Sequence, residues 1–138
     1  MRVMDDLLLN HPTLEGMDPE MIYELAKHAS LRQFKAGEYI FRQGEKAGHV
    51  YLLESGKVEL ELFSAPGGPL VVQSVEAGQV LGWSWLIAPY DWCFDARVVE
   101  ATELIELDAT YLRELIDRDH HVGYEIMKRF VKVIAERL

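Results

Sequence analysis

Short runs of alternating hydrophobic and polar residues fill the middle of the chain, from residue 31 to residue 108. In residues 58–62, one valine and two leucines alternate with two glutamates. Successive side chains of a strand point to opposite faces, so this run offers one face to a core and one to water. Similar runs, rich in Val and Leu, occupy residues 51–53, 71–75 and 104–107. The pattern predicts a sheet of short strands.

Glycines separate these runs at turn-like intervals. Gly37, Gly44 and Gly56 each follow or interrupt an apolar run, and Gly78 and Gly82 continue the series. Glycine can adopt positive φ without a Cβ clash, which lets the chain reverse direction. Residues 64–69, Ser-Ala-Pro-Gly-Gly-Pro, are typical of a hairpin loop. Together the strands and turns predict a small β-roll.

Helical patterns lie on both sides of this segment. Residues 1–10 and 18–30 are predicted as helices, the second with Asp18 as cap and Pro19 in its first turn. A short helix is predicted for residues 110–117 and a longer one for 119–138. The longer one carries a broad apolar stripe: Val122, Ile126, Met127, Phe130, Val131, Val133, Ile134 and Leu138. This stripe is wider than packing against one roll requires.

Composition narrows the class of protein. A chain of 138 residues with 49% hydrophobic content is expected to form one domain, 1–138, and has no apolar run of about 20 residues that could span a bilayer. The two acids in the first six residues do not fit a secretion signal, so we expect a cytoplasmic protein. The net charge of −9 opposes binding to DNA, because DNA affinity depends on Lys and Arg neutralising phosphates. We therefore expect no nucleic-acid or membrane binding by this chain.

No metal or catalytic site is predicted. The single cysteine, Cys93, excludes an internal disulfide and a multi-cysteine iron–sulfur site, and a lone Cys among apolar residues is usually inert. The five histidines show no metal-ligand spacing. No nucleophile with its base and no phosphate-binding loop stands out. The chain is not expected to be an enzyme.

The glycine-spaced segment resembles a known family. The carrying residues are Phe34-Lys35-Ala36-Gly37-Glu38-Tyr39-Ile40-Phe41-Arg42-Gln43-Gly44-Glu45 and Tyr51-Leu52-Leu53-Glu54-Ser55-Gly56-Lys57-Val58. They resemble the cyclic-nucleotide-binding domain of catabolite-activator-type regulators, protein kinase regulatory subunits and gated channels, over about residues 31–138.

The resemblance implies a mainly β fold with flanking helices. It would be a double-stranded β-helix, jelly-roll-like, with N-terminal helices in 1–30, the roll in 31–108 and C-terminal helices, including one long one, in 109–138. In the family the long helix pairs with its twin across a two-fold axis, which implies a homodimer. The expected dimer contacts are Val122, Ile126, Met127, Phe130, Val133 and Ile134. The alternative is that the helix folds back over its own roll.

The family's ligand pocket corresponds to two short segments here. The expected pocket positions are Gly82, Trp83, Ser84, Trp85, Phe94, Asp95 and Ala96. In the family a glutamate binds the ribose hydroxyl and an arginine pairs with the cyclic phosphate. Trp83 and Phe94 stand in their places, and Asp95 adds a carboxylate where a Ser or Thr would donate. Each lost charge-assisted bond costs on the order of 2 kcal/mol, so cyclic AMP and cyclic GMP are disfavoured and no cofactor is expected.

Arg97 is the candidate that could replace the missing phosphate contact. Strand alternation argues against it, because Ala96 would face inward together with Phe94 and Val98 while Arg97 points to the other side. Pairing of Arg97 with a surface acid such as Asp95 is therefore favoured, unless a bulge changes the register.

The polar anchors have been replaced by an aromatic cluster. Within a dozen residues lie Trp83, Trp85, Tyr90, Trp92, Cys93 and Phe94. Such a cluster either fills the former ligand cavity or lines a cavity for a flat apolar molecule, with Ser84 and the indole N–H groups as polar contacts. Filling is the favoured interpretation.

Three hypotheses follow. The leading one is a non-catalytic sensor module, dimeric through its last helix, whose pocket has diverged from cyclic nucleotides and whose output passes through a hinge at residues 107–119. The second is a cyclic-nucleotide receptor with atypical contacts. The third is a ligand-free interaction scaffold.

Overall fold

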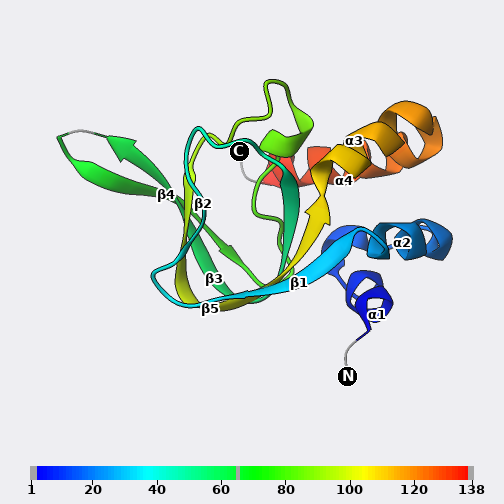
Figure 1. The fold of residues 1–138 in the computed structure, drawn as a ribbon, viewed down its shortest axis with the longest axis horizontal. Coiled ribbons are helices and arrows are strands. Elements are labelled where there is room, and N and C mark those ends of the chain that lie inside the picture. Colours follow the sequence, from blue (N-terminus) through cyan, green and yellow to red (C-terminus); the bar gives the residue numbers. More distant parts are fainter. Residues whose placement is uncertain (1–2, 65, 137–138) are drawn as a thin grey trace.

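The computed structural model describes residues 3–64 and 66–136. Helices lie before and after the strands of a twisted antiparallel sheet along the chain (Figure 1). In order the elements are α1 Met4–Leu9, the 3-10 helix η1 Pro12–Leu14, α2 Pro19–Ala26, β1 Ala29–Phe34, β2 Tyr39–Phe41, β3 His49–Ser64, β4 Gly68–Glu76, the 3-10 helix η2 Ser84–Leu86, β5 Asp95–Asp108, α3 Ala109–Arg118 and α4 His120–Glu136.

The sheet has the strand order β1-β5-β3-β4, and β2 also pairs with β5. All pairings are antiparallel, and β5 is the shared partner of β1, β2 and β3. The strands curl into a roll with the helices gathered at one side, while the β3–β4 hairpin projects from the other side (Figure 1). The predicted mainly β, jelly-roll-like fold with flanking helices and a C-terminal helix is confirmed.

Two strands are longer than the sequence pattern predicts. The runs 51–53 and 58–62 both lie in β3, and 104–107 is the end of β5. Gly56 does not end a strand, because the pairing of β3 with β5 continues past it through shifts of register. Gly56 has a φ of +94°, and a Cβ there would lie 2.6 Å from Thr102 Cα in β5. The glycine therefore allows β3 to bend while it stays against β5.

The N-terminal helices are shorter than predicted. Of residues 18–30, the helix takes only Pro19–Ala26, and Ala29 begins β1, where it pairs with Leu107. Sheet pairing overrides the helical pattern at this end. Asp18 caps α2 as predicted, its carboxylate accepting a hydrogen bond from the Glu20 N–H at 3.0 Å.

Caps also explain the break between the last two helices. The Asp108 carboxylate accepts from Tyr111 N at the start of α3, and the Asp119 carboxylate accepts from His121 N and Val122 N at the start of α4. Each cap satisfies backbone donors that have no partner inside the helix. The chain can therefore turn between α3 and α4.

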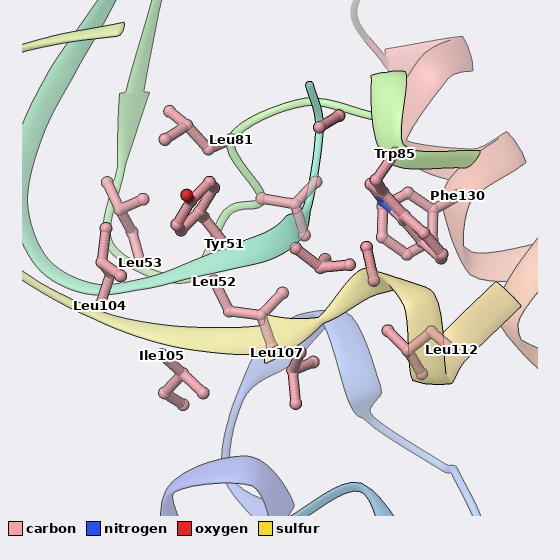
Figure 2. Packing of buried hydrophobic residues seen from close by; sticks show 14 of the residues in the cluster. Tyr51, Leu52, Leu53, Leu81, Trp85, Leu104, Ile105, Leu107, Leu112 and Phe130 are labelled. Atoms are coloured by element: carbon pink, nitrogen blue, oxygen red, sulfur yellow. The ribbon is translucent and has the colours of Figure 1, made fainter. Parts of the chain in front are cut away.

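The core lies between the sheet and the helices. Leu52, Leu53, Leu104 and Ile105 from β3 and β5 are almost completely buried (Figure 2). Leu112 of α3 extends the same cluster. Within the described ranges, no helix is long and apolar enough to cross a membrane.

The stripe of α4 is divided between two faces. Val122, Ile126 and Phe130 are buried in the chain's own core, and Val133 packs partly against it. Val122, Ile126 and Phe130 are thus used for packing within the chain, whereas Val133 is only half-buried. Met127 is exposed and Ile134 is half-buried, while Leu138 lies outside the described residues. The helix folds back over its own chain, and a second apolar face remains in solvent.

Candidate functional site

A loop between β4 and β5, residues 77–94, forms one wall of a cavity in the roll. Gly82 has a φ of +143°, and a Cβ there would lie 3.3 Å from the Trp92 ring. Only glycine fits this close approach well. Trp83 follows as the N-cap of η2, whose first two residues are Ser84 and Trp85.

The cavity has a volume of about 70 Å³. Its ten lining residues come from β2, β3, β4 and the loop: Phe41, Leu60, Gln73, Leu81, Gly82, Trp83, Ser84, Trp92, Cys93 and Phe94. Phe41 and Trp92 stack in parallel with ring centroids 3.8 Å apart. This stacked pair gives the cavity one rigid aromatic wall.

Four of the seven predicted pocket positions line this cavity, namely Gly82, Trp83, Ser84 and Phe94. The other three, Trp85, Asp95 and Ala96, are buried and are not among its lining residues. Ala96 faces the core of the roll, as strand alternation requires.

Trp85 points away from the cavity and toward the C-terminal helix. It is fully buried, and its ring meets Phe130 of α4 edge-on with centroids 5.1 Å apart (Figure 2). Its indole Nε1 has no hydrogen-bond partner among the residues that the structure describes. Trp85 therefore fills the space between the loop and α4 and is not a pocket residue.

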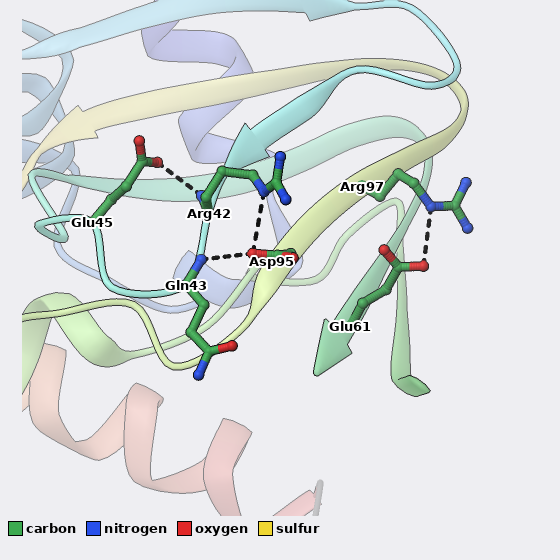
Figure 3. A network of polar contacts seen from close by, with 6 residues as sticks. All are labelled: Arg42, Gln43, Glu45, Glu61, Asp95 and Arg97. Atoms are coloured by element: carbon green, nitrogen blue, oxygen red, sulfur yellow. Dashed lines mark hydrogen bonds and ion pairs between the residues drawn. The ribbon is translucent and has the colours of Figure 1, made fainter. Parts of the chain in front are cut away.

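Asp95 binds two residues of the turn that follows β2. Its carboxylate accepts a hydrogen bond from the Gln43 N–H at 2.7 Å and lies 3.3 Å from Arg42 Nε (Figure 3). The Asp95 carboxylate, expected at the phosphate position, therefore binds this turn and does not line the cavity. It stabilises the turn between β2 and β3.

Arg97 lies on the outer face of the roll. Its guanidinium donates through Nε to Glu61 at 3.0 Å (Figure 3). Its Nη2 donates to Glu59, also at 3.0 Å. The hydrogen bond to Glu61 raises the pKa of Arg97 above its ordinary value. With both sides of its fork occupied and no place in the cavity lining, Arg97 is not positioned as the anion contact considered from sequence.

Sequence analysis missed the strand residues of the cavity. Phe41, Leu60 and Gln73 lie in β2, β3 and β4, and Leu81 lies in the loop just before Gly82. The alternation at residues 58–62 does place Leu60 on the inner face. Which inner residues border a cavity depends on how the strands curl, and the pattern does not show this.

Arg113 of α3 connects the loop to the helices. Its Nη1 donates to the Trp85 carbonyl oxygen at 2.7 Å, and its guanidinium lies 4.3 Å from the centre of the Tyr90 ring. A second contact reaches the Ala47 carbonyl oxygen at 3.4 Å. One side chain in the predicted hinge therefore holds two points of the cavity loop.

Tyr51 is a buried ionisable group of β3. Burial raises the pKa of Tyr51 to about 12, so its phenol stays protonated. Within residues 3–64 and 66–136, no cluster of three or more His, Cys, Asp or Glu side chains could hold a metal ion.

Several known proteins are similar to this chain in sequence and in fold. The chain is 25% identical over 136 residues to the CRP-like cAMP-activated global transcriptional regulator of Mycobacterium tuberculosis, covering 98% of this chain and 58% of that relative. It superimposes with a TM-score of 0.87 on a crystal structure from Geobacter metallireducens GS-15 that carries the name cyclic nucleotide-binding protein, at 26% identity, covering 99% and 98% of the two chains. The cAMP-bound regulatory domain of Toxoplasma gondii PKA shares the fold, with a TM-score of 0.76 at 24% identity over 94% of this chain and 49% of that one.

The chain spans 58% of the length of the mycobacterial regulator it matches. The family model described as cyclic nucleotide-binding domain matches residues 31–119, which include most of β1, all of β2 to β5 and the cavity loop. By its sequence, its sheet topology and its loop, this chain belongs to the cyclic nucleotide-binding domain family.

Proposed function

We propose that this chain is a non-catalytic sensor module that has kept the family's roll but not its recognition of cyclic AMP or cyclic GMP, and that it signals as a homodimer through α4. The observation that carries the proposal is the cavity wall. Trp83 and Phe94, which the resemblance puts in place of the two polar anchors, both line the cavity.

The charge of the site supports this proposal. None of the ten lining residues is Lys, Arg or His. Arg97 and Arg42, the nearest arginines along the paired strands, are bound to Glu59, Glu61 and Asp95. A cyclic phosphate buried here would lose its hydration without gaining a cation, which costs several kcal/mol.

The size of the cavity supports it as well. Pockets that hold a drug-sized ligand have volumes of about 300–1,000 Å³, against about 70 Å³ here. A nucleotide would have to displace the rings of Trp83 and Phe94. The two rings therefore disfavour a nucleotide because they occupy space and because they offer its phosphate no charged partner.

The output route rests on contacts of the loop with the last two helices. Trp85 packs on Phe130 of α4, and Arg113 of α3 holds the Trp85 carbonyl and the Tyr90 ring. A ligand that moves the loop would shift these contacts and so bias the position of α4.

The outer face of α4 supports dimerisation. Tyr124, Met127 and Val131 are 63%, 42% and 58% exposed, and Ile134 continues the series. The spacings of three, four and three residues are those of a heptad seam. A second copy of the same helix is the occupant that such a seam fits, because a two-fold axis brings the same face from each chain together.

Two measurements test the proposal. Calorimetric titration with cyclic AMP and cyclic GMP is expected to give no binding with a dissociation constant below about 100 µM, and micromolar binding of either nucleotide contradicts the loss of recognition. Sedimentation of Val131→Asp is expected to give a monomer where the parent chain is a dimer. Val3→Asp, the same change at another exposed valine, is the control and should leave the dimer intact.

The scaffold alternative makes a different prediction. A ligand-free scaffold would keep its dimer after Trp83→Ala and would show no change of melting temperature with any small molecule. The sensor proposal requires that some ligand raises the melting temperature, because a molecule that binds only the folded state stabilises it.

A further inference from the structure

Most of the cavity wall is apolar. Four aromatic rings line it, from Phe41, Trp83, Trp92 and Phe94, together with the side chains of Leu60 and Leu81. We propose that this cavity is a binding site for a small, uncharged, planar ring compound of the size of phenol or indole. The inference rests on the proposed function and names the ligand class of the same site.

Charge around the cavity selects for a neutral ligand. No lining residue is Asp, Glu, Lys, Arg or His. The Asp95 carboxylate, next in sequence to Phe94, is held outside by Arg42 and the Gln43 N–H. An anion placed among the rings would lose hydration with no partner of opposite charge, whereas a neutral ring gains by leaving water.

Polar contacts at the mouth favour a ring that carries one hydrogen-bonding group. Gln73 of β4 lies half-buried at the rim, paired in register with Leu60. Across the described part of the chain, no hydrogen bond ties down its carboxamide. The Ser84 hydroxyl has only a weak contact with Cys93 Sγ at 3.9 Å. A phenol hydroxyl or an indole N–H could bind either group, which sets the orientation of the ring.

The volume is small even for a single ring. An engineered apolar cavity of about 150 Å³ binds benzene, and this cavity has about 70 Å³. A ring therefore enters only if the mouth widens. Phe41, Leu60 and Trp92 are buried and form a fixed floor, whereas Trp83 and Phe94 are half-buried and Cys93 is exposed. The residues that must move are those with solvent beside them.

Paired ligands of equal shape and different charge test the inference. Phenol is compared with benzoate, and indole with indole-3-carboxylate, by saturation-transfer NMR and by tryptophan fluorescence of the full chain. The neutral member of each pair is expected to bind with a dissociation constant below about 1 mM and at least about tenfold more tightly than its carboxylate. Equal binding within the pairs, or no binding of phenol and indole at all, overturns the inference.

Variants locate the site. Leu60→Phe fills the cavity from its floor and is expected to abolish binding of both neutral rings. Gln73→Leu keeps the size of the side chain and should weaken phenol by about threefold to tenfold through the lost hydrogen bond. The control Gln33→Leu changes an exposed glutamine on β1, bound to Glu103, and should have no effect. If Leu60→Phe does not fold, Gln73→Leu against Gln33→Leu decides the location, and equal affinities for phenol overturn it.

The two proposals fail in different ways. Binding of cyclic AMP would contradict the proposed function whatever the ring compounds do. Absence of both cyclic nucleotide and ring binding would overturn only the ligand class inferred here, since the diverged pocket and the dimer helix would remain.

Discussion

Gly56→Ala is expected to be far more harmful than the same change at Gly37. The two glycines have nearly equal backbone angles, with φ of +94° and +93°. A Cβ at Gly37 would have nothing within 4 Å, whereas one at Gly56 would lie 2.6 Å from Thr102 Cα and would also overlap the Thr102 hydroxyl and the Ala101 carbonyl. The pair therefore separates backbone strain from lack of space.

The magnitudes follow from these two terms. Positive φ costs a residue with a Cβ about 1–2 kcal/mol, and this is the whole expected loss for Gly37→Ala. Overpacking adds about 1–3 kcal/mol when neighbours must shift, and two of the three nearest neighbours of Gly56 are backbone atoms of β5 that cannot rotate away. Gly56→Ala is therefore expected to lower the free energy of unfolding by about 2–5 kcal/mol.

Urea denaturation, followed by tryptophan fluorescence at one fixed protein concentration, measures both losses. Gly44→Ala serves as a second open-space control, with φ of +91° and nothing within 4 Å of its Cβ. Equal losses at Gly56 and Gly37 would refute the argument that β3 needs glycine because β5 lies so close.

Three further outcomes are expected. Burial lowers the pKa of His11, whose ring contacts the Leu53 carbonyl at 3.0 Å. The unfolded chain therefore binds more protons than the folded chain as pH falls below about 6.5, and the free energy of unfolding decreases there. His11→Gln should flatten this decrease in urea denaturation measured between pH 7 and pH 5. Phe130→Ala should cost about 3–5 kcal/mol in urea denaturation, while Met127→Ala on the exposed face costs less than about 1 and instead weakens the dimer in sedimentation. Arg113→Lys should speed amide hydrogen exchange in residues 82–94, because a lysine cannot both stack on Tyr90 and hold the Trp85 carbonyl.

The turns of the roll were predictable because their requirement is local. Gly37, Gly44 and Gly78 all have positive φ and lie at chain reversals, as their spacing indicates. Gly56 has the same φ but sits inside a strand, since its role depends on the neighbouring strand β5. A local pattern shows that a glycine is needed and does not show what approaches it.

The division of the aromatic cluster could not be predicted in the same way. Trp83 and Trp85 are two residues apart, yet one lines the cavity and the other packs on α4. The difference arises from the 3-10 turn at Ser84–Leu86, which follows no hydrophobic period. For α4, the stripe combined two faces that composition alone cannot separate, because both are apolar.

In the proposed sensor, the position of η2 would separate ligand recognition from output. Trp83 on one side of the turn contacts the cavity, and Trp85 on the other side contacts Phe130. A change of ligand class can therefore proceed through Trp83 and Phe94 while the packing of Trp85 on α4 is retained. This arrangement implies that Trp83→Phe alters ligand affinity at constant dimer stability, whereas Trp85→Phe alters the coupling between ligand and dimer, since the loop then loses part of its contact with the helix.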